Sequence, residues 1–423
     1  MYDILNVYLE NGLRVVMHRI PNSKTISCGI WIRQGSKHED DNNNGLSHLL
    51  EHLMINRENH LNPRFQHLID GVTAEGVIYN AGTTKESTSF HFTGLSDTLD
   101  NCLETLATIA IDNSTFGDEL LENEKKVVTQ EAISFYSSFG QIKERVGQAL
   151  WGDIGVGKII VGNIENVKSA KIEDLEAIIH GAYAPENSVL LVIGDIDYQE
   201  TLSMINCYFS RWKDTNTRTF NEVIQSEPGV YFNNGNNGKS TVISVGFRTP
   251  GYMAKDRIYI EIASKIIGDS GLDSRLAQEI RMKRGLAYNL GSFANFYENR
   301  GNFAFTSVCS KESVEELVKI VVYEFNKAKQ NGFRRDEMEK AKKILKTNRL
   351  LELGDLTSQL KFLGKCVTYG HLYSLEQELR NIEKADCDTL NKVIKDIIRE
   401  ESLALAIIGE CDIDNIIPLL KVN

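Results

Sequence analysis

The distribution of apolar and polar positions predicts both helices and strands, grouped in blocks along the chain. Residues 117–138 place apolar side chains three and four positions apart among charged ones, and residues 312–330 repeat this amphipathic helical pattern. Residues 24–32 and 239–247 alternate instead, which is typical of strands. Because strands and helices do not alternate regularly, we expect an α+β fold in which helices pack on one side of a mostly antiparallel sheet.

The chain also contains repeated segments that share one offset. Residues 188–197 and 402–414 both run from an apolar strand into a turn of glycine and acidic residues, and Gly194 and Gly409 are 215 positions apart. The same offset relates the two alternating strands described above. Two similarities with a common offset indicate a duplicated domain.

The duplication predicts two homologous domains in tandem. We expect an N-terminal domain over 1–212, a polar linker over 213–229 and a C-terminal domain over 230–423. A length of 423 residues fits two to three domains of ordinary size.

Composition and charge narrow the possible partners and the compartment. The formal charge is −11, from 58 acidic and 47 basic side chains, which disfavours nucleic acid and favours a cationic or extended peptide, although it can equally serve solubility alone. No signal peptide and no apolar run long enough to span a membrane is evident, so we expect no membrane insertion. Seven scattered cysteines without a CxxC pair disfavour a disulfide framework, and we expect a cytoplasmic protein.

The segment "GLSHLLEHLMIN" at residues 45–56 reads as a short apolar helix that nevertheless carries His48, Glu51 and His52. Positions four apart lie on one helical face, so His48 and His52 can direct two ring nitrogens at one point. Two imidazoles and one further ligand would leave a zinc ion an open position, as in catalytic sites. The alternative is a pair of ordinary surface histidines, but an HxxEH match by chance is expected in roughly one in a hundred such chains.

The missing ligand is sought on the amphipathic helix predicted over 117–138. Glu124 and Glu131 are seven positions apart, two helical turns, so both carboxylates face one side. One of them can coordinate the metal while the other holds a ligand histidine. Taken alone, the two glutamates would be interpreted as part of a solvated, charged face of the helix.

HxxEH followed by these glutamates resembles the pitrilysin/insulinase family of inverted zinc metallopeptidases, the inverzincins. The resemblance is to the short-chain branch, which is similar to the mitochondrial processing peptidase β subunit and bacterial relatives. It extends to "NAGTTKESTSFHF" at 80–92, to "YAPENSVLLVIGDID" at 183–197 and to "SRLAQEIRMKRGLAYNL" at 274–290.

This resemblance implies a zinc metalloendopeptidase with the metal in the N-terminal domain. Its zinc ligands would be His48, His52 and Glu131, Glu51 would be the general base that activates a zinc-bound water, and Glu124 would be the supporting carboxylate. The C-terminal domain lacks the zinc motif.

Two further sets of residues would handle the peptide. The segment containing Asn80, Ala81 and Thr83 would present an open strand edge to which an extended peptide can pair, although it can also be an ordinary sheet strand. The resemblance implies that Arg281 and Tyr288 polarise the scissile carbonyl and stabilise the oxyanion. Arg284 is closer to the tyrosine in sequence but is the less favoured partner.

The resemblance also implies an assembly. A homodimer that encloses short or unfolded peptides in a chamber is the simplest arrangement, and a heterodimer with a homologous subunit is the other. A non-catalytic scaffold, or one subunit of a two-component peptidase, is the alternative function. The family has an aromatic residue followed by Lys-Gly-Thr after the zinc helix, whereas this chain reads "HLMINRENHLN". We expect this departure to affect peptide choice and to leave the zinc chemistry alone.

Overall fold

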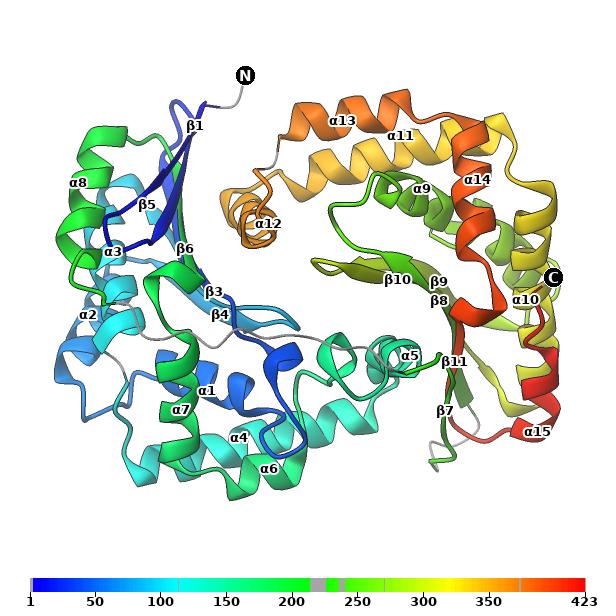
Figure 1. The fold of residues 1–423 in the computed structure, drawn as a ribbon, viewed down its shortest axis with the longest axis horizontal. Helices are drawn as coiled ribbons and strands as arrows, with labels where there is room; N and C mark the ends of the chain where they lie inside the picture. Colours follow the sequence, from blue (N-terminus) through cyan, green and yellow to red (C-terminus); the bar gives the residue numbers. More distant parts are fainter. Residues whose placement is uncertain are drawn as a thin grey trace. The chain divides into compact units, whose positions relative to one another are not determined.

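The computed structural model describes residues 3–112, 114–213, 226–235, 240–269, 271–372 and 374–422. The chain forms two compact units (Figure 1). Unit 1 comprises residues 1–134, 158–223 and 352–374, and unit 2 comprises residues 135–157, 224–351 and 375–423. Most of the predicted linker at 213–229 lies outside the described residues.

Unit 1 is built on a six-stranded sheet in the order β1-β2-β6-β3-β5-β4. Among the strand pairs that the described residues form within this sheet, only β2 and β6 are parallel. The strands are β1 (Asp3–Tyr8), β2 (Arg14–Arg19), β3 (Thr25–Ile32), β4 (Ile78–Thr83), β5 (Thr88–Leu95) and β6 (Ser188–Gly194). The helices are α1 (Leu46–Ile55), α2 (Pro63–Ala74), α3 (Leu99–Ala107), α4 (Asp118–Ser137), α6 (Ile164–Ser169), α7 (Ile172–Ala182), α8 (Tyr198–Phe209) and α12 (Leu356–Thr368).

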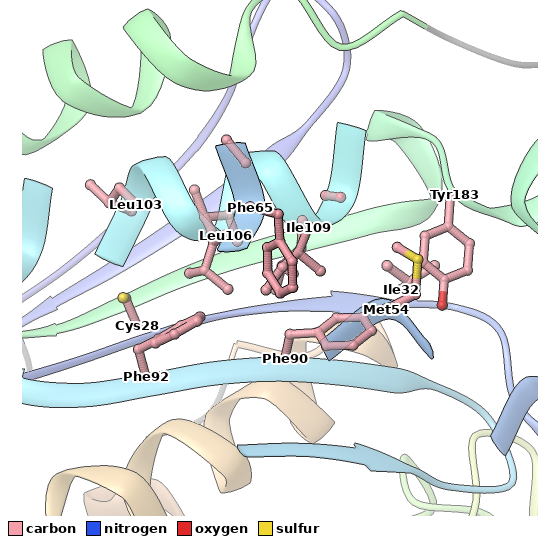
Figure 2. Close-up of a cluster of buried hydrophobic side chains, with 14 of the residues drawn as sticks. Cys28, Ile32, Met54, Phe65, Phe90, Phe92, Leu103, Leu106, Ile109 and Tyr183 are labelled. Atoms are coloured by element: carbon pink, nitrogen blue, oxygen red, sulfur yellow. The ribbon is translucent and has the colours of Figure 1, made fainter. Parts of the chain in front are cut away.

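The main core of unit 1 lies between one face of this sheet and a layer of helices. Figure 2 shows Phe90 and Phe92 of β5 facing Phe65 of α2 and Leu106 of α3, and all four side chains are fully buried. The alternate side chains of β3 and β5 point to the opposite face, as the strand period of two requires.

Helix α12 covers that opposite face, although it comes from the second half of the sequence. Thr357 and Thr93 share a hydrogen bond of 2.8 Å between their hydroxyls, and Gly364 packs directly against the indole of Trp31. Both faces of β3 and β6 are therefore covered, which explains why nearly every residue of these strands is buried.

Unit 2 repeats this arrangement with a five-stranded sheet in the order β7-β11-β8-β10-β9. Its strands are β7 (Val230–Asn233), β8 (Ser240–Pro250), β9 (Ala287–Phe296), β10 (Arg300–Ser310) and β11 (Leu403–Ile408). Its helices are α5 (Ile142–Trp151), α9 (Arg257–Ile267), α10 (Val314–Asn331), α11 (Arg335–Glu352), α13 (Leu375–Lys384), α14 (Cys387–Ile397) and α15 (Ile413–Ile416).

The two faces of the second sheet are also both covered. Phe247 of β8 and Phe303 of β10 meet Phe325 of α10 on one face, with ring centroids 4.9 and 5.8 Å apart. Helix α5, from the first half of the sequence, packs with Val146 and Leu150 on the other face. The two units have thus exchanged one helix each, whereas the domains predicted from the sequence are contiguous.

The shared topology confirms the α+β prediction of two homologous domains. Gly194 and Gly409 both have positive φ, and a Cβ at these positions would meet Ile26 and Thr241 respectively. Ile26 and Thr241 are again 215 positions apart. The predicted helices and strands that led to this fold class all occur, and the exchanged helices add a layer on the second face of each sheet.

In the part of the chain that the structure describes, no helix is both long and apolar enough to cross a membrane.

Candidate metal centre

The HxxEH segment forms α1, which is buried on its apolar side and polar on the side that faces α4. Leu46, Leu49, Leu50 and Leu53 belong to the core of unit 1. A buried carboxylate holds the first turn, since Glu39 accepts hydrogen bonds from the Gly45 and Ser47 amides at 2.9 and 2.7 Å. This contact satisfies amides that a helix leaves unpaired and anchors α1 at its N-terminus.

His48 and His52 meet Glu131 of α4 on the polar side of α1. The Nε2 atoms of His48 and His52 lie 3.5 and 3.6 Å from Glu131 Oε2. One ligand atom from each residue lies within 4.8 Å of the others, and among the described residues these three form the cluster able to hold a metal ion.

The two histidine–glutamate separations fit a zinc ion. With bonds of about 2.0–2.1 Å, tetrahedral ligand atoms lie about 3.3 Å apart, close to the two distances above. Both imidazoles present Nε2, and Glu131 is half exposed, so one side of the cluster is open to solvent. The residues present therefore fit a site with three protein ligands.

Glu124 lies on α4, like Glu131, and contacts the ring nitrogen of His52 that does not face the cluster. Its Oε2 lies 3.0 Å from His52 Nδ1, which leaves Nε2 of that ring for the metal. Its Oε1 accepts a hydrogen bond of 2.6 Å from Asn56 Nδ2. Carboxylates in this position set the tautomer of a ligand histidine and orient its ring.

The pKa values of the two histidines shift in opposite directions. Burial, with the charge of His52, lowers the pKa of His48 to about 4. Burial also acts to lower the pKa of His52, but the hydrogen bond to Glu124 and the charges of Glu131 and Glu51 outweigh it and raise that pKa.

Glu51 lies on α1 beside the two histidines and contacts a different element. Its Oε2 accepts a hydrogen bond of 2.6 Å from Thr83 Oγ1, at the end of β4. Burial raises the pKa of Glu51, and the Thr83 hydrogen bond opposes this rise. A carboxylate with a raised pKa beside a candidate metal site has the properties of a general base.

The predicted peptide-binding segment forms the edge strand β4. Asn80 and Ala81 pair with His91 and Phe90 of β5, and β4 is the last strand in the order of the described sheet. The Ala81 amide donates to the Asn80 side chain at 2.8 Å, so a pairing peptide would have to replace this contact.

The predicted Arg/Tyr pair lies in unit 2. The Arg281 guanidinium stacks over the Tyr288 ring, 4.1 Å from its centroid, and Tyr288 is 78% exposed. Arg284 instead binds Glu279 at 2.6 Å. The two residues of the favoured pair thus contact each other, and their catalytic role stays a prediction.

Sequence reasoning missed the contacts of Asn56 and Glu39 and assigned Thr83 only to peptide binding. Asn56 lies in the segment that was expected to leave the zinc chemistry alone, yet it contacts Glu124. A signal was available, because Asn56 is four positions after His52, on the same helical face. Glu39 gave no comparable signal, since a loop separates it from α1.

A repeated α+β fold with an HxxEH helix facing a glutamate pair defines a peptidase-like class. Comparison with protein families agrees. The insulinase family model (peptidase family M16) matches residues 14–161, and the model of the peptidase M16 inactive domain matches residues 169–345. The chain therefore belongs to the M16 (insulinase) peptidase family.

Its relatives match over nearly their whole length. The chain is similar to an uncharacterised zinc protease of Rickettsia felis, with 28% identity over 96% of this chain and 97% of the relative. It is similar to the uncharacterised zinc protease YmxG of Bacillus subtilis, with 25% identity over 95% of this chain and 97% of the relative. The β subunit of the mitochondrial-processing peptidase of Mus musculus is 26% identical over 95% of this chain and 83% of that protein.

Solved structures share the fold at low identity. A protease from Helicobacter pylori superimposes with a TM-score of 0.87 at 19% identity, covering 97% of this chain and 100% of that one. A peptidase M16 inactive domain from Pseudomonas fluorescens gives a TM-score of 0.85 at 18% identity, with 96% and 98% covered. These likenesses concern the fold.

Proposed function

We propose that this protein is a zinc-dependent endopeptidase that cuts short or unfolded peptides. The observation that carries the proposal is the cluster of His48, His52 and Glu131, with ligand atoms at zinc-like separations and Glu51 beside it. The zinc proteases among the relatives support the choice of metal.

Each residue has a distinct task in this reaction. Zinc, when bound, polarises the scissile carbonyl and lowers the pKa of a water to about 7. Glu51 accepts the proton of the attacking water and passes it to the leaving amine as the C–N bond breaks. Thr83 orients the Glu51 carboxylate through its 2.6 Å hydrogen bond, and Glu124 holds His52.

The peptide is held by its main chain in this proposal. The free edge of β4, at Asn80 and Ala81, adds an extended peptide as a further strand. Arg281 and Tyr288 of a second subunit supply donors to the oxyanion that develops on the carbonyl oxygen. The formal charge of −11 favours cationic peptides.

The assembly is part of the same proposal. We place the protein in the cytoplasm as a homodimer, or as a heterodimer with a homologous subunit, that encloses the peptide in a chamber. Size measurement by light scattering, alone and with a homologous chain, tests this.

A second candidate function is a non-catalytic scaffold, or one subunit of a two-component peptidase. The observation that favours it is the match of residues 169–345 to a domain described as inactive. A scaffold needs no metal, so zinc content separates the two candidates.

The experiment combines metal analysis with cleavage of a pool of short peptides, using a Glu51→Gln control. The proposal expects about one zinc per chain, cleavage by the native protein and none by Glu51→Gln with its zinc retained. Zinc without cleavage would point to the two-component peptidase, and absence of zinc after reconstitution would favour the scaffold.

A further inference from the structure

We propose that Asn56 is a positioning residue of the metal centre, which acts on His52 through Glu124. Asn56 Nδ2 donates to Glu124 Oε1 at 2.6 Å, and Glu124 Oε2 lies 3.0 Å from His52 Nδ1. His52 Nε2 in turn lies 3.6 Å from Glu131 Oε2. This inference rests on the proposed function, because it requires that His52 ligates a metal ion.

The orientation of the Asn56 amide is fixed by its two contacts. Its Oδ1 accepts a hydrogen bond of 2.8 Å from the backbone amide of Glu58, so only Nδ2 can face the Glu124 carboxylate. The donor contact of Nδ2 and the acceptor contact of Oδ1 require the same orientation of the amide. Asn56 also caps the C-terminus of α1, so the side chain is held where the helix ends.

The contact determines which oxygen of Glu124 serves the histidine. Glu124 is 9% exposed, and a buried carboxylate needs partners for both oxygens. With Oε1 engaged by Asn56, Oε2 is directed at His52 Nδ1, and the histidine is held in the tautomer that presents Nε2 as a ligand. The Asn56 amide is neutral, so it adds no charge beside this hydrogen bond.

The arrangement follows from helical spacing. His48, His52 and Asn56 are four positions apart in turn, so one face of α1 and its cap supplies both histidines and the residue that holds Glu124. The segment in which this chain departs from the family pattern therefore takes part in building the site.

The test is a double-mutant cycle with zinc affinity as the readout. Dissociation constants are measured by competition with a chromogenic chelator for the native protein, Asn56→Leu, Glu124→Ala and the double variant. We expect Asn56→Leu to weaken zinc binding about 10-fold, and the double variant to bind no more weakly than Glu124→Ala alone. Asn56→Leu and the double variant both lose the hydrogen bond from the Glu58 amide. The effect of this loss therefore cancels in the coupling energy that the cycle gives.

A matched control separates this effect from the general loss of an asparagine. Asn101 on α3 also donates to a carboxylate, that of Glu75, at 2.8 Å, but it lies on the surface of the same unit. Asn101→Leu should leave zinc affinity unchanged. Thermal unfolding of the metal-free variants shows whether each is folded, and Asn56→Ala replaces Asn56→Leu if the larger side chain prevents folding.

The outcomes distinguish the inference from the proposed function. The role of Asn56 is overturned if Asn56→Leu binds zinc with native affinity. It is also overturned if the effects of Asn56→Leu and Glu124→Ala on zinc affinity are fully additive. Neither result contradicts the metal site itself. If the native protein itself binds no zinc, the proposed function fails and the inference fails with it.

Discussion

Thr83 Oγ1 donates a hydrogen bond of 2.6 Å to Glu51 Oε2, which joins the last residue of the edge strand β4 to the helix that carries both histidines. A peptide that pairs with β4 would extend along the strand whose last residue holds the proposed general base. In the proposed peptidase, peptide binding at β4 would therefore be coupled to the orientation of the Glu51 carboxylate within unit 1.

Replacement of Thr83 by valine should impair turnover without removing the metal. A hydrogen bond to a charged group contributes about 1.5–3 kcal/mol, so kcat should fall about 10- to 150-fold if the bond persists in the transition state. Thr83→Ser keeps the hydroxyl and should retain most activity. Steady-state kinetics with zinc analysis of each variant measures this. Equal kcat values for Thr83→Ser and Thr83→Val would exclude a role of the Thr83 hydroxyl in turnover.

Replacement of Glu131 by glutamine should remove the stabilisation that zinc provides. Glu131 is half exposed, so its loss should leave the unfolding temperature of the metal-free protein unchanged. Zinc at 100 times its dissociation constant should stabilise the native protein by about 2.7 kcal/mol and the variant by much less. Calorimetry with and without a chelator provides the comparison, and an undiminished zinc shift in Glu131→Gln would remove Glu131 from the ligand set.

His91 should make unit 1 less stable in mild acid. Burial and the charge of Lys361 lower the pKa of His91 to about 4, whereas an unfolded histidine titrates near 6.5. The unfolded chain therefore binds more protons than the folded one as the pH falls from 6.5 to 4, and stability is lost across this window.

The variant His91→Phe should lack this contribution. The ring can keep the packing on Trp31, whose centroid lies 6.5 Å away. Between pH 7 and pH 5 the native protein should lose about 2 kcal/mol more than the variant. Urea unfolding at both pH values measures the difference, and parallel losses would show that His91 protonates without penalty in the folded state.

The exchanged helix α12 should be sensitive to added volume at Gly364. A Cβ at this position would overlap the Trp31 ring, so Gly364→Ala should destabilise the protein by about 1–3 kcal/mol despite its better helix propensity. Gly147 on α5 is the matched control, because a Cβ there meets no atom within 4 Å. Denaturant unfolding of both variants tests this. If Gly364→Ala is as stable as Gly147→Ala, α12 can shift on β3 to accommodate the added methyl group.

The local patterns predicted the elements and the residues of the candidate metal cluster, because these residues are close in sequence or fixed by helical spacing. His48 and His52 are four apart, Glu124 and Glu131 are seven apart, and each pair lies on one helix, α1 or α4. The 215-residue offset likewise revealed the duplication, since the repeated strands keep their order in both sheets.

The tertiary structure alone decided which distant residues meet. Thr83 and Glu51 are 32 positions apart and Asn56 and Glu124 are 68 apart, and no periodicity relates them. The exchange of α5 and α12 could not be predicted from the sequence either, because the pattern of an amphipathic helix does not specify which sheet it packs on. Spacing along a helix is set by the backbone, whereas contacts between elements are set by how their faces pack.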